Sequence, residues 1–263
     1  MNDLLRLAIS ASIEAGLEIL NIYNAPFEIE YKADESPLTT ADTAANKIIM
    51  KHLSQTDIPV LSEEGRSIPY QERKNWTKLW IVDPLDGTKE FIKKNDEFTV
   101  NIALIQEGKP ILGVIYAPVL DELYYGEQNL GAFKVSEASK RFSNNKLNGN
   151  AQRLPLPSIK TDFGVVASRS HLSPETSAYI DEMKTTRSVQ IITKGSSLKL
   201  CMIAEGVADV YPRFAPTSEW DIAAGHAIVN AAGGKIVQAA NSEKELFYNK
   251  EDILNPNFIA FAK

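Results

Sequence analysis

Hydrophobic residues recur every three to four positions through residues 4–20, and this spacing predicts one long helix near the N-terminus. Residues 27–32 alternate in polarity enough to form a short strand. The Ser-Pro-Leu-Thr-Thr segment at 36–40 then predicts a turn and a helix cap, followed by a second helix at 41–53.

Short apolar runs bounded by turn residues dominate the middle of the chain. They predict strands at 58–61, 79–82, 98–105, 111–116, 122–125 and 131–134. Turns such as the Glu-Gly-Lys-Pro segment at 107–110 join neighbouring strands directly, which favours an antiparallel sheet.

Residues 136–159 are polar and rich in turn residues, so we place a domain boundary within them. The predicted N-terminal domain, residues 1–155, is α+β with an antiparallel sheet. In the predicted C-terminal domain, residues 156–263, strands alternate with helices, which is typical of an α/β unit. Its strands are expected at 163–167, 189–193, 207–211, 235–237 and 258–261, and its helices at 174–183, 196–205 and 219–232.

At 263 residues, of which 44% are hydrophobic, the chain is long enough to bury a substantial core. Its formal charge of −6 argues against a protein that mainly binds nucleic acid polymers, although local cations still allow an anionic small substrate. Cys201 is the single cysteine, so it has no intramolecular disulfide partner, and its apolar neighbours predict a helix core. The N-terminus lacks the features of a signal peptide and no run of about 18 apolar residues occurs, so we expect a cytoplasmic protein.

The predicted strand at 79–82 ends in the sequence Asp83-Pro84-Leu85-Asp86-Gly87-Thr88. Pro84 restricts its own backbone angle, and Gly87 permits a conformation or a close ligand approach that a Cβ would block. A helix that starts near Thr88 would offer free N–H groups to an anion. Two carboxylates beside an anion site are reasonable if divalent cations lie between the carboxylates and a phosphate. The segment therefore predicts a metal-dependent phosphatase site.

Further carboxylates are candidates for the same site because of where they stand. Glu63 and its neighbour Glu64 follow a predicted strand, whereas Asp42 and Asp221 stand at the starts of predicted helices. Simpler interpretations exist: the glutamates could lie in a solvated loop, and the aspartates could be ordinary helix caps. Hard cations such as Mg²⁺ prefer oxygen ligands, and a pair of ions can hold both the attacking water and the leaving oxygen.

Together, these motifs resemble those of the lithium-sensitive, magnesium-dependent phosphatase superfamily that includes inositol monophosphatase, fructose-1,6-bisphosphatase and the 3′(2′),5′-bisphosphate nucleotidases. The segment 83–88 is similar to the central signature of that family, residues 62–64 to its upstream glutamate motif, and residues 219–225 to its downstream Trp-Asp motif. The three motifs occur in family order over most of the chain. The resemblance implies a mixed α/β (α+β) fold, the layered αβαβα sandwich with two sheets and helices between and outside them.

The segments 36–42, 60–64 and 83–105 resemble more specifically the bacterial CysQ branch, which removes the 3′-phosphate from adenosine 3′,5′-bisphosphate. This resemblance implies a 3′(2′),5′-bisphosphate nucleotidase with two or three Mg²⁺ ions per site, inhibition by lithium and a role in sulfur assimilation. Peripheral association with the cytoplasmic face of the inner membrane is left open, as is the oligomeric state.

The same resemblance implies roles for individual residues. The metal ligands would be Glu63, Asp83, the carbonyl of Leu85, Asp86 and Asp221. Asp42 and Thr88 would position or deprotonate the attacking water, and Glu63 would be catalytic as well as metal-binding. Substrate contacts are expected at Asp86, Gly87, Thr88, His171, Ser196, Lys199, Arg213 and Asp221.

Two of these residues support a substrate class by their charge. Lys199 is a lone cation in an otherwise apolar predicted helix, and Arg213 follows a strand end and a proline. The planar fork of arginine suits a second phosphate, and lysine supplies a mobile point charge. Because an inositol phosphatase has only one phosphate to bind, the pair favours a bisphosphate substrate. The simpler interpretation places Lys199 on the solvated face of its helix.

Other functions fit parts of the sequence. An inositol or sugar phosphatase of the same superfamily would keep the metal site and lose only the argument from Lys199 and Arg213. A haloacid-dehalogenase-type phosphatase also has an Asp-Gly-Thr strand end, but its aspartates are two positions apart, whereas Asp83 and Asp86 are three apart. A non-catalytic regulator that binds metal or nucleotide would be expected to have lost one of the catalytic or metal-binding side chains, and none is replaced.

Overall fold

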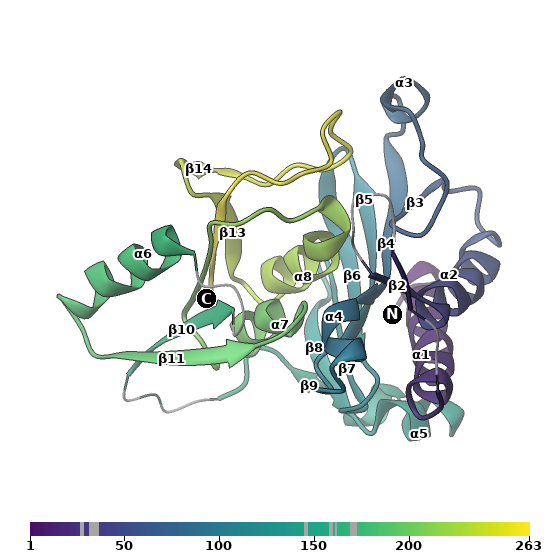
Figure 1. Cartoon of the computed structure of the whole chain (residues 1–263), viewed down its shortest axis with the longest axis horizontal. Coiled ribbons are helices and arrows are strands. Elements are labelled where there is room, and N and C mark those ends of the chain that lie inside the picture. The colour runs from purple at the N-terminus through teal and green to yellow at the C-terminus, as the bar shows by residue number, and fades with distance from the viewer. Residues whose placement is uncertain (27–28, 32–36, 145–146, 158–159, 161, 169–172) are drawn as a thin grey trace.

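The computed structural model describes residues 1–26, 29–31, 37–144, 147–157, 160, 162–168 and 173–263. Two β-sheets form its frame, and helices lie outside and between them (Figure 1). From one side to the other the layers are helix, sheet, helix, sheet, helix. The predicted αβαβα sandwich is confirmed.

The outer helical layer and its connections come from the N-terminal residues and from one later turn of helix. Its elements are α1 (Asp3–Tyr23), β1 (Ile29–Tyr31), β2 (Pro37–Thr39), α2 (Thr40–Leu53) and α5 (Ala138–Ser143). Asn2 caps α1, because its side chain accepts the N–H of Leu5 at 2.8 Å. The apolar residues of α1 and α2 that recur at helical spacing are buried against the first sheet.

The first sheet has seven strands in the order β3-β4-β5-β6-β7-β8-β9. These are β3 (Val60–Ser62), β4 (Lys78–Asp86), β5 (Thr99–Gln106), β6 (Lys109–Ala117), β7 (Glu122–Glu127), β8 (Gly131–Ser136) and β9 (Gln152–Arg153). β3 and β4 are parallel, and the remaining pairs are antiparallel. Side chains alternate between the faces: Trp80 and Val82 face the outer helices, whereas Leu79 and Ile81 face the inner ones.

The middle layer consists of α7 (Leu198–Glu205) and α8 (Glu219–Ala231), which lie between the two sheets. α8 packs so closely on β6 that a Cβ added at Gly113 would lie 2.2 Å from the carbonyl oxygen of Ala224. Cys201 is buried in α7, as predicted, and burial raises the pKa of its thiol well above the usual range. His226 of α8 is also buried, with Nδ1 2.9 Å from the hydroxyl of Tyr248.

The second sheet has the strand order β11-β10-β12-β15-β13-β14, and α6 covers its outer face. Its elements are β10 (Phe163–Ser168), α6 (Pro174–Lys184), β11 (Val189–Lys194), β12 (Val210–Arg213), β13 (Lys235–Gln238), β14 (Asn241–Glu245) and β15 (Phe258–Phe261). Val166 and Tyr211 face the middle helices, whereas Val165 and Val210 pack with Ile180 of α6.

Several element predictions need correction. The strand predicted at 207–211 begins later and reaches Arg213, because β12 pairs with β15 over Val210 to Arg213. The exposed strand β14 was not predicted, since Asn-Ser-Glu-Lys-Glu has no apolar pattern. The segment 136–159, interpreted as turns, also contains α5, the 3₁₀ turn Leu147–Asn150 and β9. The C-terminal sheet is mixed, because β12, β15 and β13 are antiparallel.

Short helices α3 (Tyr70–Arg73) and α4 (Thr88–Ile92) precede and follow β4. In the described part of the chain, no helix is both long and apolar enough to cross a bilayer. α8 contacts strands of both sheets, and the domain boundary at 155/156 stays a prediction.

Candidate active site

A β-bulge at the end of β4 places two aspartates close together. Asp83 pairs with Asn101 and Asp86 with Thr99, so β4 contains one more residue than β5 over this stretch. Asp83 is buried, and its Oδ1 accepts the N–H of Leu85 at 3.1 Å. Gly87 follows with φ of +96°, which a glycine adopts without strain, and α4 begins at the next residue. The predicted strand and helix are present, but in place of the predicted turn β4 continues through a bulge to Asp86, and only Gly87 separates it from α4.

Asp42 connects the start of α2 to the start of α4. Its Oδ2 accepts the N–H of Thr39 at 2.7 Å and the Thr39 hydroxyl at 2.6 Å, which completes a capping box. Its Oδ1 accepts the hydroxyl of Thr88 at 3.2 Å. The N-cap of α2 is therefore Thr39 and not Asp42, whose side chain completes the capping box from the third helical position and is also a partner of Thr88.

Asp221 has the equivalent position in α8. Its Oδ2 accepts the N–H of Ser218 at 2.8 Å, again as the third residue of a capping box. Ser197 links this helix to β4, because its hydroxyl lies 2.9 Å from the carbonyl oxygen of Asp221 and 2.7 Å from Oδ2 of Asp86. Two helix starts thus present a carboxylate to the same end of β4.

Glu63 reaches this cluster through the parallel pairing of β3 with β4. Its N–H donates to the carbonyl of Val82 at 3.1 Å, directly before Asp83 in the chain. The carboxyl groups of Glu63 and Asp83 are close enough to share a hydrogen bond. The structure therefore brings together the predicted acidic residues from β3, β4 and α8.

The cluster carries more negative charge than its surroundings compensate. Burial raises the pKa of Asp83 well above its usual range, and the charges of Glu63, Asp86 and Asp221 raise it further. Burial and the charge of Asp86 raise the pKa of Asp221 to about 7, and burial raises the pKa of Asp42. A divalent cation supplies the charge that such a set of buried oxygens needs, so the donor set fits a hard ion such as Mg²⁺.

Several carboxylate oxygens are engaged by protein donors. Ser196 and Ser197 donate to Oδ2 of Asp86, and the backbone of α8 holds Oδ2 of Asp221. Within the described ranges, no group of three His, Cys, Asp or Glu side chains is arranged so that it could hold a metal ion. The assignment of Glu63, Asp83, Leu85, Asp86 and Asp221 as ligands therefore stays a prediction.

A cavity of about 170 Å³ opens beside the cluster. The predicted substrate residues that line it are Asp86, Gly87, Ser196, Lys199, Arg213 and Asp221. Thr88 and Asp42 are not part of its lining, and His171 lies outside the described residues. Carboxylates from β4 and α8 and cations from α7 and β12 thus line the same cavity.

The two cations differ in how they are held. Nζ of Lys199 donates to the carbonyl of Ser196 at 2.6 Å, and burial lowers the pKa of this lysine. Arg213 donates through Nη2 to the carbonyl of Pro216 at 3.2 Å. Its Nε is buried and has no hydrogen-bond partner among the described residues. Lys199 therefore faces a cavity rather than open solvent, and Arg213 has a donor to spare for an anion.

Sequence reasoning missed some residues of this region. Lys89 and Thr217 line the cavity but were not among the predicted contacts, whereas Ser197 and Tyr211 lie in the segments 195–199 and 211–214, which resemble nucleotide-contacting segments of the CysQ branch. Thr99 and Asn101 lie behind it and were also missed. A signal existed for this last pair, because polar residues at alternate positions interrupt the otherwise apolar strand β5.

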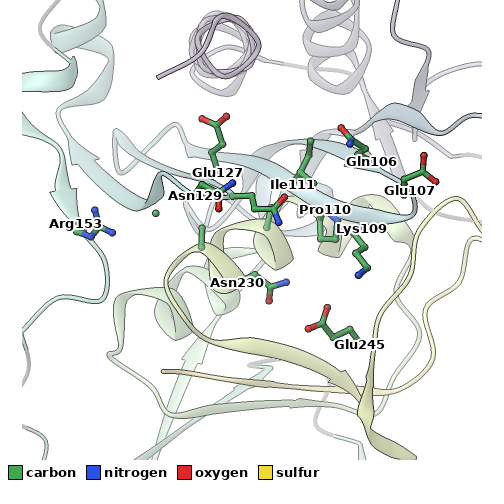
Figure 2. Close-up of a pocket in the computed structure, with 14 residues that line it drawn as sticks. Gln106, Glu107, Lys109, Pro110, Ile111, Glu127, Asn129, Arg153, Asn230 and Glu245 are labelled. Atoms are coloured by element: carbon green, nitrogen blue, oxygen red, sulfur yellow. The ribbon is translucent and has the colours of Figure 1, made fainter.

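A larger cavity of about 670 Å³ lies elsewhere, where the β5–β6 and β7–β8 turns meet the end of α8 and β14 (Figure 2). Both cationic and acidic side chains line it, among them Lys109, Arg153 and Glu245. It contains none of the residues that the sequence predicted. A third cavity of about 400 Å³ is lined by Glu63 but by none of the predicted substrate contacts, so the 170 Å³ cavity, which six of those contacts line, is the candidate active site.

Comparison with known proteins agrees with the motifs. The profile of the Inositol monophosphatase family matches residues 1–262, and the chain belongs to this family. It is 46% identical to the 3′(2′),5′-bisphosphate nucleotidase CysQ of Salmonella typhimurium over 249 residues, which is 93% of this chain and 94% of the relative. It is 45% identical, over the same shares of both chains, to the protein of that name from Escherichia coli.

Solved structures give the same result. The crystal structure of CysQ from Bacteroides thetaiotaomicron, described as a bacterial member of the inositol monophosphatase family, is 51% identical with a TM-score of 0.88. The match covers 98% of this chain and 97% of that one. The predicted resemblance to the family and to its CysQ branch is confirmed.

Proposed function

We propose that this protein is a CysQ-type phosphatase that hydrolyses the 3′-phosphate of adenosine 3′,5′-bisphosphate, giving AMP and phosphate. The observation that carries the proposal is the cavity that Asp86 and Asp221 line together with Lys199 and Arg213. The carboxylates suit a metal-bound phosphate that is cleaved, and the cations suit a second phosphate that is only bound. The similarity to nucleotidases named CysQ supports the same substrate.

Mg²⁺ is the proposed cofactor, held by Glu63, Asp83, the carbonyl of Leu85, Asp86 and Asp221. When bound, it would neutralise the phosphate dianion and lower the pKa of a bound water. The raised pKa of Asp83 and of Asp221 supports a cation there, because a bound positive charge would offset both the burial that mainly raises these pKa values and the repulsion from neighbouring carboxylates.

The pair Asp42 and Thr88 prepares the attacking water. The Thr88 hydroxyl lies 3.2 Å from Oδ1 of Asp42 and 3.3 Å from the carbonyl oxygen of Leu85, and when it donates to Asp42 its lone pairs face away from that carboxylate. Thr88 can then accept a hydrogen bond from water and orient it, with Asp42 as the group that bears the charge. Because the buried Asp42 is fixed by Thr39, this orientation is set before substrate arrives.

Binding uses backbone N–H groups and cationic side chains of the cavity. The N–H groups of Gly87 and Thr88 at the start of α4 hold the phosphate that is cleaved. Lys199 and the free donor of Arg213 bind the 5′-phosphate of the nucleotide. The water oxygen forms the new P–O bond, the ribose oxygen leaves, and no covalent enzyme intermediate is required. A substrate of this kind arises in sulfotransfer, which accounts for the expected role in sulfur assimilation.

Phosphate release, measured with Mg²⁺ from adenosine 3′,5′-bisphosphate and from inositol 1-phosphate side by side, tests the proposal. We expect a strong preference for the nucleotide and loss of turnover in Asp83→Asn. Arg213→Ala should raise KM for the nucleotide about 10-fold to 100-fold and leave KM for inositol 1-phosphate nearly unchanged.

Arg153→Ala is the matched control, because it removes an arginine from the larger cavity instead. A preference for inositol 1-phosphate would be consistent with metal-dependent hydrolysis but would contradict adenosine 3′,5′-bisphosphate as the substrate. An equal rise of KM in both arginine variants would reject the role of Arg213.

A further inference from the structure

Three buried polar side chains lie at the beginning of β5 and just before it. Glu97, Thr99 and Asn101 are 7%, 0% and 1% exposed. Further along the face that Thr99 and Asn101 share, Ala103 and Ile105 pack into the apolar core around α7 and α8. We call Glu97, Thr99 and Asn101 the β5 ladder.

Each member of the β5 ladder bonds one residue of the segment between β11 and α7, in matching order. The contacts are Glu97 Oε2 accepting the N–H of Gly195 at 2.8 Å, Thr99 Oγ1 lying 2.7 Å from Ser196 Oγ, and Asn101 Nδ2 donating to Ser197 Oγ at 2.8 Å. Every second residue from Glu97 to Asn101 therefore contacts one of three consecutive residues, from Gly195 to Ser197.

The segment 195–197 is held in a conformation that it would not choose alone. Ser196 has φ of +51°, in the left-handed region that disfavours residues with a Cβ. A Cβ added at Gly195 would lie 3.0 Å from Cβ of Glu97, so the segment lies tightly against the ladder. Such strained backbone persists where surrounding contacts determine it and is frequent at functional sites.

The segment in turn determines the orientation of Asp86. Ser196 Oγ and Ser197 Oγ each lie 2.7 Å from Oδ2 of Asp86, and Asn101 Nδ2 lies 3.4 Å from the same oxygen. Hydrogen bonds from hydroxyls to a carboxylate are strong, and these hydroxyls are themselves fixed by the ladder. The β5 ladder thus reaches Asp86 mainly through the two serines.

We propose that the β5 ladder is a set of positioning residues that fixes the Asp86 carboxylate for cation binding by way of Ser196 and Ser197. This inference rests on the proposed function, which makes Asp86 a metal ligand. Partners behind a ligand typically change metal affinity about 10-fold to 100-fold when removed. Each polar group of the ladder is buried, and its desolvation is compensated by a contact with the segment that holds Asp86.

The test is a titration of purified protein with Mn²⁺, an ion that also prefers oxygen ligands, in which electron paramagnetic resonance measures the free ion. We expect Asn101→Ala to weaken Mn²⁺ binding about 10-fold to 100-fold. Ser197→Ala should weaken it similarly. The double variant should bind no more weakly than Ser197→Ala alone, since Asn101 acts through that hydroxyl.

Asn230→Ala is the matched control, because it truncates an asparagine at the far end of α8. Circular dichroism of each metal-free variant shows whether it is folded, and Asn101→Ser replaces Asn101→Ala if the latter is not. A purely packing role predicts lower thermal stability with unchanged Mn²⁺ affinity in the folded variants.

Unchanged Mn²⁺ affinity in Asn101→Ala, or independent additive losses in the double variant, would overturn the ladder as a positioning device. Failure of the unaltered protein to bind Mn²⁺ would instead reject the metal site itself, and with it the proposed function. The two failures are therefore distinguishable.

Discussion

At the scale of single residues, the Asp42–Thr88 contact gives the most direct test of water activation. Thr88→Val keeps the shape of the side chain and removes the hydroxyl that Asp42 Oδ1 accepts. We expect kcat for adenosine 3′,5′-bisphosphate to fall about 10²-fold to 10⁴-fold with KM little changed, because the group acts on the water and not on the nucleotide. Steady-state phosphate release measures both constants.

Thr88→Ser is the control, since it restores a hydroxyl at the same position, and it should retain most of the activity. A substitution of Asp42 would be a poorer test of water activation, because Oδ2 of Asp42 completes the capping box of α2. Removal of this carboxylate would also lower the free energy of unfolding by about 1 kcal/mol. If Thr88→Val kept nearly full kcat, another group would have to activate the water.

At the scale of elements, the packing of α8 on β6 couples the stability of the sandwich to its site. Gly113→Ala would put a Cβ 2.2 Å from the carbonyl oxygen of Ala224, so α8 has to move, and Asp221 lies in its first turn. We expect a loss of about 1–3 kcal/mol in the free energy of unfolding together with weaker Mn²⁺ binding. Urea denaturation and the Mn²⁺ titration measure the two effects.

Gly149→Ala is the matched control, because nothing lies within 4 Å of the position where its Cβ would be placed. It should leave both quantities unchanged. A Gly113→Ala protein with full stability would show that α8 can move away from β6 at little cost.

At the scale of the whole molecule, the acidic cluster links stability to pH and to divalent cations. The pKa of Asp221 rises from 3.8 in the unfolded reference to about 7 in the folded chain. Between these values the folded chain keeps a proton that the unfolded chain has lost, so Asp221 lowers the stability of the metal-free protein progressively as pH rises through this range. The raised pKa of Asp83 acts in the same direction.

Mg²⁺ should offset this loss, because it binds the deprotonated cluster of the folded state. At about pH 8, with Mg²⁺ about a hundredfold above its Kd, we expect Tm to rise by about 5–10 °C. At about pH 5.5 the rise should be clearly smaller, since protons compete with the ion. Differential scanning calorimetry at both pH values measures the shifts, and an equal rise at both would contradict the link to the cluster.

The sequence by itself determined the elements and the chemistry that depend on residues close together in the chain. The period of the apolar residues predicted α1, α2 and most strands, because helices and strands bury one face at a characteristic spacing. The segment 83–88 predicted a strand end with two aspartates before a helix, since proline and glycine restrict the backbone locally, although the structure forms a β-bulge where a turn was predicted. The polar strand β14 lacks such a pattern and was missed.

Only the tertiary structure decided which of these side chains contact one another and how their pKa values are shifted. Parallel pairing brings Glu63 to Asp83, and the crossing of β5 by the segment 195–197 supplies the hydroxyls that hold Asp86. Local preferences do not encode contacts between residues about a hundred positions apart, because these depend on how whole layers pack. Burial likewise depends on every layer together, so the raised pKa of Asp221 follows from the folded sandwich and from no segment of its sequence.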